Sequence, residues 1–379
     1  MKKNAVLFGM AALMLFSLTG CLTERQESVD SGKNIRLTYD EYAYCENGYY
    51  YYFPNTGQIF FYDLSSAQAV PLCNKPECEH TEQEQDTCNS YIRGMESGIQ
   101  YYNDKLYFLV SSDNELALYR QDPDGNNREK AAVLSSAFQS SHPFSSVLVD
   151  RSNVFVLLPQ LSGDDVIFNL YTKKLTDDQE LQLLYEGQHV AEFIYLPQYY
   201  NGNYYFNTSY YAYVEDELIS YGNLYQYNPD ENNVELFLEG SVDHFVLWGN
   251  TGFCSSNHGA LTAINMDTKE TRLLLQKDEY NRFFDLSIDK DYFYIDNSRS
   301  CMILNPEGYQ AREIQIYQHD GTLVDTIKGP ETGYECINFS GDIPCLVRCT
   351  GTGILEVLDK SQIGTGSYRW ETIRIVSYE

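Results

Sequence analysis

The chain has 379 residues, and its 26 Lys and Arg stand against 54 Asp and Glu, which gives a formal net charge of −28 at pH 7. An acidic surface of this kind repels phosphate backbones, so nucleic acid is excluded as a partner. The length exceeds what one ordinary core serves, and we therefore expect either two domains or a repeat architecture.

The N-terminal segment has the pattern of a lipoprotein export signal. Two lysines precede an apolar stretch from Ala5 to Leu18, and the order Leu-Thr-Gly-Cys ends this stretch at Cys21. An apolar stretch of this length is too short to cross a bilayer as a helix. We expect residues 1–20 to be removed as a signal peptide and Cys21 to become the lipidated first residue. An ordinary signal peptide with a chance cysteine is the alternative.

Residues 21–34 are polar and acidic and show no strand or helix period, so they predict a flexible tether. Two acyl chains on Cys21 suffice for stable anchoring, because each buried methylene contributes about 0.8 kcal/mol. We therefore expect a monomeric body, residues 35–379, held by its lipid anchor on the outer face of the cytoplasmic membrane. Its partners there are the membrane itself and an extracellular protein, peptide or glycan.

The rest of the chain repeats one unit, in which a hydrophobic or aromatic strand, a tight Asn, Asp or Gly turn and a second strand follow one another. Seven such strand pairs lie at Tyr42 to Tyr52, Ile99 to Val110, Val147 to Leu158, Tyr199 to Phe206, Phe245 to Cys254, Leu286 to Ile295 and Ile337 to Val347. A third strand and usually a fourth follow each pair, for example Gln58 to Asp63. Four short strands per unit, at spacings of roughly 40 to 56 residues, are typical of β-propeller blades.

We therefore predict an all-β fold, a single β-propeller over residues 35–379 with seven blades of four antiparallel strands. Continuous runs such as Leu106 to Val110 suit strands that neighbouring blades cover on both faces. Glycines interrupt the seventh unit, so six or eight blades are alternatives, and two β-sandwiches are the competing architecture. The ring closes either through Trp370 to Val376, as the outer strand of the last blade, or through Ile35 to Tyr39.

One local motif is sharper than the repeat. The sequence Cys73-x4-Cys78-x-His80-x7-Cys88 gathers three thiols and an imidazole within 16 residues, on the loop that leaves the first blade. Three sulfurs and one nitrogen form a suitable tetrahedral set for zinc. Such a zinc ion would be structural, because four protein ligands leave no open position for a catalytic water.

A disulfide is the rival interpretation of this loop. Cys88 paired with Cys73 or Cys78 would close a small loop and stabilise it by roughly 2 to 3 kcal/mol, with His80 as a bystander. Unlinked thiols are a third interpretation. The chain has 10 cysteines, so lipidation of Cys21 leaves nine, and at least one of these is unpaired or a ligand.

A second, looser group contains Cys336, Cys345 and Cys349. Cys345 and Cys349 lie on one predicted strand and are too far apart along it to bond each other. Cys336 on the preceding strand is able to pair with either of them. Small buried apolar side chains are the alternative interpretation.

Motifs that carry catalytic chemistry are absent from the sequence. There is no Gly-x-Ser-x-Gly elbow, no His-Glu-x-x-His helix, no phosphate-binding Gly-x4-Gly-Lys and no dinucleotide fingerprint. The best candidate for ligand binding is the segment from Tyr210 to Tyr221, which we expect to be a long insertion between strands. Its tyrosines Tyr210, Tyr211 and Tyr213 offer apolar rings and polar hydroxyls to a sugar or peptide.

The lipobox, the acidic tether and the repeated Tyr-rich strand pairs together resemble lipid-anchored, TolB-like or receptor-related-like β-propeller proteins of Gram-positive anaerobes. The resemblance covers nearly the whole chain. The loop from Cys73 to Cys88 is similar to a Cys-Pro-Cys-His-Cys segment of the same lipoproteins. What the resemblance implies is the fold and the location, and it carries no catalytic residues across.

The sequence leaves three functions open. The first is a non-enzymatic, surface-tethered propeller that acts as a ligand-binding or protein-binding scaffold, and this is the function we predict. The second is an extracellular enzyme that acts on a glycan or peptide, which requires carboxylates or a histidine converging near the axis. The third is a metal-handling or redox accessory protein, which requires an exposed reactive thiol site between Cys73 and Cys88.

Overall fold

The computed structural model describes residues 42–53, 56–138, 145–162, 165–176, 180–189, 192–215, 217–240, 242–256, 259–276, 285–296, 313–328, 336–338, 344–349 and 355–375. The predicted signal peptide, Cys21 and the tether lie outside these ranges, as does the segment from Ile35 to Tyr39. Within the described part of the chain, no helix has the length and apolarity that a membrane span needs.

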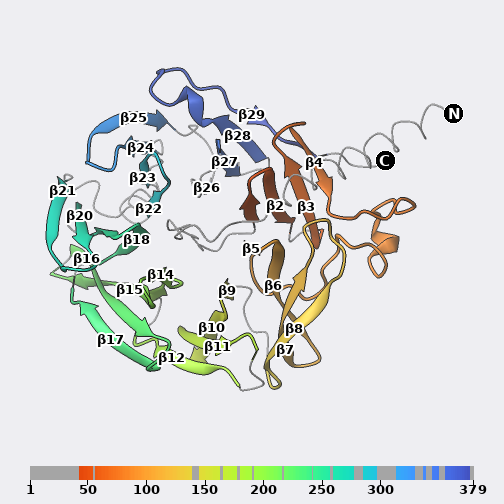
Figure 1. The fold of residues 1–379 in the computed structure, drawn as a ribbon, viewed down its shortest axis with the longest axis horizontal. Coiled ribbons are helices and arrows are strands. Elements are labelled where there is room, and N and C mark those ends of the chain that lie inside the picture. Colours follow the sequence, from red (N-terminus) through yellow and green to blue (C-terminus); the bar gives the residue numbers. More distant parts are fainter. Residues whose placement is uncertain are drawn as a thin grey trace.

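Seven sheets stand around a common axis, as Figure 1 shows, and this arrangement confirms the predicted seven-bladed β-propeller. Blades 1 to 3 contain β1 (Tyr42–Cys45), β2 (Gly48–Phe53), β3 (Gln58–Asp63) and β4 (Gln68–Pro71); β5 (Gln100–Tyr102), β6 (Lys105–Ser112), β7 (Glu115–Gln121) and β8 (Glu129–Ser135); and β9 (Ser146–Asp150), β10 (Asn153–Ser162), β11 (Asp165–Lys174) and β12 (Gln182–Glu186). Blade 4 contains β13 (Phe193–Ile194), β14 (Gln198–Tyr200), β15 (Asn203–Val214), β16 (Glu217–Asn228) and β17 (Asn233–Leu238).

The remaining blades repeat the same plan. Blades 5 to 7 contain β18 (His244–Trp248), β19 (Thr251–Ser255), β20 (Ala260–Asn265) and β21 (Thr271–Gln276); β22 (Asp285–Ile288), β23 (Phe293–Asp296), β24 (Glu313–Tyr317) and β25 (Leu323–Lys328); and β26 (Cys336–Asn338), β27 (Cys345–Cys349), β28 (Leu355–Asp359) and β29 (Glu371–Thr372). Two short 3₁₀ helices, η2 (Glu82–Glu84) and η4 (Lys360–Gln362), and the last strand, β30 (Arg374–Ile375), complete the described elements. Neighbouring strands within each blade pair antiparallel, and in blade 4 both β13 and β14 pair with β15. The first strands lie nearest the axis and the last at the rim (Figure 1).

The turns that join the first two strands of a blade have the chemistry that the sequence predicts. Asn103 and Asp104, between β5 and β6, have φ of 49° and 57°. Asn201 and Gly202, between β14 and β15, have φ of 47° and 86°. Tight hairpins with the right-handed twist need positive φ at these positions, and Asn, Asp and Gly tolerate it best.

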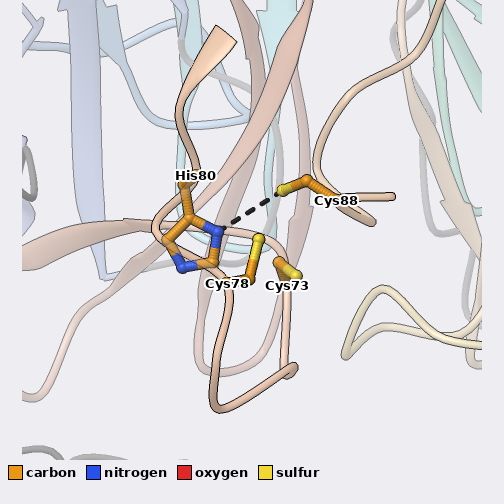
Figure 2. Close-up of side chains that lie close together, drawn as sticks. All are labelled: Cys73, Cys78, His80 and Cys88. Carbon is orange, nitrogen blue, oxygen red and sulfur yellow. Dashed lines mark hydrogen bonds between the residues drawn. The ribbon is translucent and has the colours of Figure 1, made fainter. Parts of the chain in front are cut away.

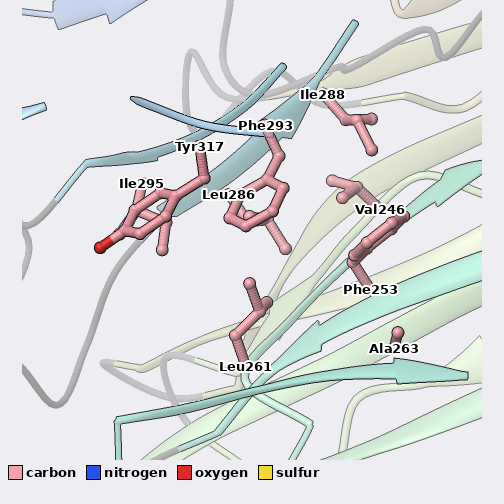
Figure 3. Close-up of a cluster of buried hydrophobic side chains, with 9 residues drawn as sticks. All are labelled: Val246, Phe253, Leu261, Ala263, Leu286, Ile288, Phe293, Ile295 and Tyr317. Atoms are coloured by element: carbon pink, nitrogen blue, oxygen red, sulfur yellow. The ribbon is translucent and has the colours of Figure 1, made fainter. Parts of the chain in front are cut away.

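Each blade buries both faces of its sheet against its neighbours. The cluster in Figure 3 joins blades 5 and 6: Val246, Phe253, Leu261 and Ala263 come from β18 to β20, and Leu286, Ile288, Phe293, Ile295 and Tyr317 come from β22 to β24. Comparable clusters lie between other neighbouring blades. This two-sided burial explains why the central strands are hydrophobic throughout and do not alternate.

Glutamine side chains add a polar link between the inner strands of neighbouring blades. Gln100 on β5 donates from Nε2 to the carbonyl of Val149 on β9 (2.8 Å) and accepts the Val149 amide. Gln198 on β14 holds β18 in the same way, through the Phe245 carbonyl (3.0 Å) and the Leu247 amide (2.8 Å). A buried side-chain amide thus satisfies backbone groups that face the next blade.

The two outer strands of blades 2 to 6 share a β-bulge. The register shifts between a buried Leu or Ile of the third strand and the residue after it, and one extra residue of the fourth strand is left unpaired. In one shift of each blade that residue follows an exposed aliphatic one, in the pairs Val133-Leu134, Leu183-Leu184, Leu236-Phe237, Leu273-Leu274 and Leu323-Val324. Blade 2 has a second shift, between Leu118 and Tyr119, which leaves out Ala131. Bulges twist an edge strand and so protect the exposed rim from pairing with another chain.

The C-terminal segment closes the ring. β29 pairs with β28 as the outer strand of blade 7, which agrees with the predicted role of Trp370 to Val376. β30 then pairs in parallel with β4, the outer strand of blade 1. On the inner side of this junction, the Tyr49 hydroxyl donates to the Cys345 carbonyl (3.1 Å). The last blade is therefore joined to the first both at the rim and closer to the axis.

A buried ion pair joins blades 6 and 7 and should be important for stability. Lys360 in η4 contacts Asp289 in the turn between β22 and β23, and the side chains are only 13% and 2% exposed. Asp289 also accepts from the Tyr294 hydroxyl (2.6 Å). Substitution Lys360→Met leaves this carboxylate buried without its cation, and we expect the free energy of unfolding to fall by about 3 to 5 kcal/mol.

Urea unfolding measures this loss, and a second ion pair supplies the control. Arg93 and Asp86 also form an ion pair (2.8 Å), but their side chains are 67% and 77% exposed. Arg93→Met should therefore cost less than about 1 kcal/mol. Equal losses for the two variants would show that the buried pair does not hold blades 6 and 7 together.

Candidate metal centre

The predicted Cys and His residues lie on the long connection between β4 of blade 1 and β5 of blade 2, at the outer rim of the ring (Figure 1). Backbone hydrogen bonds tie this loop to blade 1. The Leu72 amide donates to the Ile59 carbonyl, and the Ile59 amide donates to the Ser90 carbonyl, each at 2.8 Å. Both ends of the loop are therefore fixed to strand β3.

Side chains tie the same loop to blade 2. Asn74 Nδ2 donates to Asp124 (3.2 Å), and Asn89 Nδ2 donates to Asn126 (3.1 Å), both in the turn between β7 and β8. Arg128 Nη1 donates to a loop carbonyl, that of Tyr91 (2.8 Å). The loop thus bridges two neighbouring blades.

The four predicted ligands converge on one point, as Figure 2 shows. The ligand atoms of Cys73, Cys78, His80 and Cys88 all lie within 4.8 Å of one another. His80 Nδ1 lies 3.4 Å from Cys88 Sγ. Neighbouring ligands of a tetrahedral zinc ion lie about 3.3 to 3.8 Å apart, so a small contraction of this group would complete the coordination.

Local backbone geometry brings His80 next to the cysteines. A turn at Lys75 and Pro76, closed by the Cys78 amide on the Lys75 carbonyl (3.2 Å), reverses the chain before the histidine. His80 itself has φ of 57°, a left-handed conformation that is uncommon for a residue other than glycine. Its carbonyl accepts from Gln58 Nε2 (3.3 Å) and from the Tyr91 hydroxyl (3.2 Å), which hold this conformation.

Glu84 fixes the segment between His80 and Cys88. Its carboxylate accepts hydrogen bonds from the backbone amides of Glu79 (2.8 Å) and Thr81 (3.3 Å). It also accepts one from the Cys78 thiol (3.6 Å). The Cys88 amide donates to the Glu84 carbonyl (2.8 Å). The short helix η2 therefore sets the separation of the last two ligands.

The thiols differ in acidity. Hydrogen bonds from Cys73 and Ser90 lower the pKa of Cys88 to about 7, and its Sγ lies 3.0 Å from the Ser90 hydroxyl. The pKa of Cys73 is raised, first by its hydrogen bond to Cys88 and then by burial, and burial raises the pKa of Cys78. Cys88 is thus the thiol most readily converted to the thiolate that binds metals.

The structure describes Cys73, Cys78 and Cys88 as free thiols. A disulfide would use two of the four converging groups and leave the others without a role. All four groups offer soft or borderline donors, and together they form a site that suits a metal ion. The four groups could therefore hold one metal ion.

Several residues of the site carry no signal in the sequence. Ser90 and Glu84 contact the thiols, but each is one polar residue in a polar loop. Gly125, with φ of 86°, lies where an added Cβ would come within 2.4 Å of the Leu72 carbonyl. Its importance depends on this approach between two blades, which only the structure reveals.

The second cysteine group is divided between two environments. Cys336 and Cys349 are direct register partners across β26 and β27. Cys345 is a free, buried thiol whose sulfur lies 3.4 Å from the Tyr49 hydroxyl. The register therefore places Cys349, and not Cys345, opposite Cys336.

The tyrosines predicted to bind a ligand lie on strands, so the predicted insertion loop is wrong as a description of the segment. β15 and β16 continue as a long hairpin through this region. Tyr210 stacks on His189 with ring centroids 3.7 Å apart, and the Tyr211 hydroxyl donates to Asp243 (3.0 Å). Tyr213 is 76% exposed. Two of the three side chains are thus engaged within the protein.

No family model matches this chain, and no curated protein matches it in sequence. Two solved structures are similar in fold. A computationally designed protein, Ika8, has 11% identity and a TM-score of 0.47, with 90% of this chain and 89% of that chain covered. PorZ, a surface component of the type-IX secretion system of Porphyromonas gingivalis, has 11% identity and a TM-score of 0.46, with 91% of this chain and 39% of that chain covered. The resemblance to lipid-anchored TolB-like propellers stays a prediction.

The close approach of Gly125 to the loop predicts a specific effect of substitution. Gly125→Ala should push Leu72 outward and loosen the loop, so that a glutamate-specific protease cuts between Cys73 and Cys88 several times faster. Gly202→Ala is the matched control, because Gly202 also has φ of 86° but nothing lies within 4 Å of its added Cβ. Equal cleavage rates for both variants and the natural chain would contradict the packing of the loop on blade 2.

Proposed function

We propose that this protein is a lipid-anchored extracellular scaffold, in which a propeller binds a peptide or protein partner and a structural zinc ion fixes the junction of blades 1 and 2. The observation that carries the zinc proposal is the convergence of four ligand atoms within 4.8 Å. The predicted lipidation of Cys21 supports the extracellular location. In this proposal the acidic propeller supplies the binding surface.

A structural role for the zinc ion follows from the ligand set. Three thiolates and one imidazole complete a tetrahedral shell, so no position is left for water or substrate. The loop also bonds to both neighbouring blades, through Ile59 on one side and Asp124 on the other. A metal at this point would join two blades through one loop.

Two buried carboxylates have structural roles, which fits a scaffold. Glu192 is 2% exposed, and its two oxygens accept from the Tyr185 hydroxyl (2.8 Å) and the Gln188 amide (2.6 Å). Asp243 is 1% exposed and accepts from two hydroxyls, those of Tyr211 and Ser220. These acids serve internal hydrogen bonds, which is typical of structural groups.

Metal analysis tests the zinc proposal. The chain from Cys21 onward, purified without a histidine tag, should contain about one zinc per molecule, and chelation should lower the midpoint of thermal unfolding by about 5 °C or more. Cys78→Ser should lose most of the metal. Cys345→Ser, which removes a thiol outside the site, should keep it. A metal-free protein whose peptides show Cys73 or Cys78 bonded to Cys88 would establish the disulfide instead.

Metabolic labelling tests the lipid anchor. The full-length chain, expressed in a Gram-positive host, should incorporate an alkynyl palmitate and sediment with membranes, because two acyl chains give stable anchoring. Cys21→Ala should lose the label and appear in the medium or as unprocessed precursor. Unchanged labelling of this variant would show that Cys21 is not the lipidated residue.

A further inference from the structure

Among the strands that the structure describes, the central hairpins of blades 3 and 4 are the longest. β10 and β11 have 10 residues each, and β15 and β16 have 12 each, whereas β19 and β20 of blade 5 have five and six. The strands of every blade follow the same order and sense. Both long hairpins therefore project from the same side of the ring, and they belong to adjacent blades.

The extended parts of these hairpins turn apolar side chains toward each other. Leu157 of blade 3 and Phe206 of blade 4 share one buried cluster between the two blades. Side chains alternate along a strand, so Leu161 lies on the same face of β10 as Leu157, and Val214 lies on the same face of β15 as Phe206. The same register places Val166 opposite Leu161, and Ile219 opposite Ala212. We call these residues the hairpin face: Leu161, Val166, Ala212, Val214 and Ile219.

The described part of the connection from blade 3 to blade 4 contacts the base of this region. An added Cβ on Gly187 would lie 2.4 Å from the Phe168 carbonyl of blade 3, and His189 stacks on Tyr210 of blade 4. The connection therefore touches both hairpins at this level. Beyond it, Leu161 is 52% exposed and Val214 is 41% exposed. Apolar surface on two adjacent blades is thus left open to solvent.

The chemistry of the hairpin face favours a peptide over a sugar. Its exposed groups are aliphatic. The ring of Tyr210, two residues from Ala212 on the same face of β15, is engaged by His189 and by Tyr221 at a centroid distance of 5.3 Å. Residues 159–169, 186–192 and 210–221 contain seven acidic residues and no Lys or Arg. Among those with described side chains, Glu192 is buried, whereas Glu186 and Glu215 are exposed. An aliphatic surface in segments whose only charges are acidic complements aliphatic side chains next to basic ones.

We propose that the hairpin face binds a basic amphipathic segment of a partner protein. The segment would place leucine or valine side chains against Leu161 and Val214, and its Lys or Arg would face the acidic residues around them. This inference rests on the proposed scaffold function and names the chemical class of the partner. Binding requires both the apolar contact and the attraction between opposite charges.

Fluorescence anisotropy with three short synthetic peptides tests both requirements. The probes alternate lysine with leucine, glutamate with leucine, and lysine with serine. The lysine–leucine peptide should bind at least about tenfold more tightly than either of the others. Equal binding of the lysine–serine peptide would reduce the interaction to charge alone and overturn the proposal, as would equal binding of the glutamate–leucine peptide.

Two matched double variants locate the binding. Leu161→Ser with Val214→Ser should weaken binding of the lysine–leucine peptide about tenfold or more. Leu323→Ser with Val133→Ser is the control, because these residues are also 52% and 41% exposed and lie on other blades. Equal loss in both, or no loss in the first, would overturn the hairpin face.

A separate measurement distinguishes the proposed scaffold function from the proposed binding site. The natural chain is also presented with a random peptide array. If the variant with Leu161→Ser and Val214→Ser still binds peptides on the array as the natural chain does, the hairpin face is not the binding site, but the scaffold function stands. If the natural chain binds no peptide on the array and none of the three probes, both the hairpin face and the peptide-binding scaffold are overturned.

Discussion

The structure depends on one constraint: every sheet must bury both of its faces. A four-stranded sheet with runs such as Leu106 to Leu109 has no polar face to turn to water, so it needs a neighbour on each side. Repetition of such a sheet leads to a ring, because a linear stack would leave the first and last faces exposed. The C-terminal strands β29 and β30, and the Tyr49 contact with Cys345, join these two faces and complete the ring.

Polar groups act at the same junctions, where the apolar packing alone does not fix the blades in register. Glutamine amides join inner strands, and the Lys360–Asp289 pair joins blades 6 and 7. The junction of blades 1 and 2 differs, since a long connection lies at its rim and contacts both blades. Four converging ligands, His80 among them, give this loop a means of becoming rigid without a core of its own.

The fold was largely predictable from the sequence because its determinants are local. Asn103-Asp104 and Asn201-Gly202 specify tight turns, and the strands on either side are hydrophobic enough to be recognised. The segment from Tyr210 to Tyr221 resembles a loop in its sequence, because aromatic and acidic residues are mixed where a projecting hairpin is partly exposed. The metal ligands were recognisable by spacing, but Gly125 and Ser90 act through contacts between distant segments, which spacing does not report.

The central claim is that Cys73, Cys78, His80 and Cys88 close on one metal ion at the junction of two blades. X-ray absorption at the zinc edge of the purified protein measures this coordination directly. We expect three sulfur neighbours at about 2.3 Å and one nitrogen at about 2.0 to 2.1 Å. A shell of oxygen and nitrogen alone, or one with fewer than two sulfurs, would contradict it.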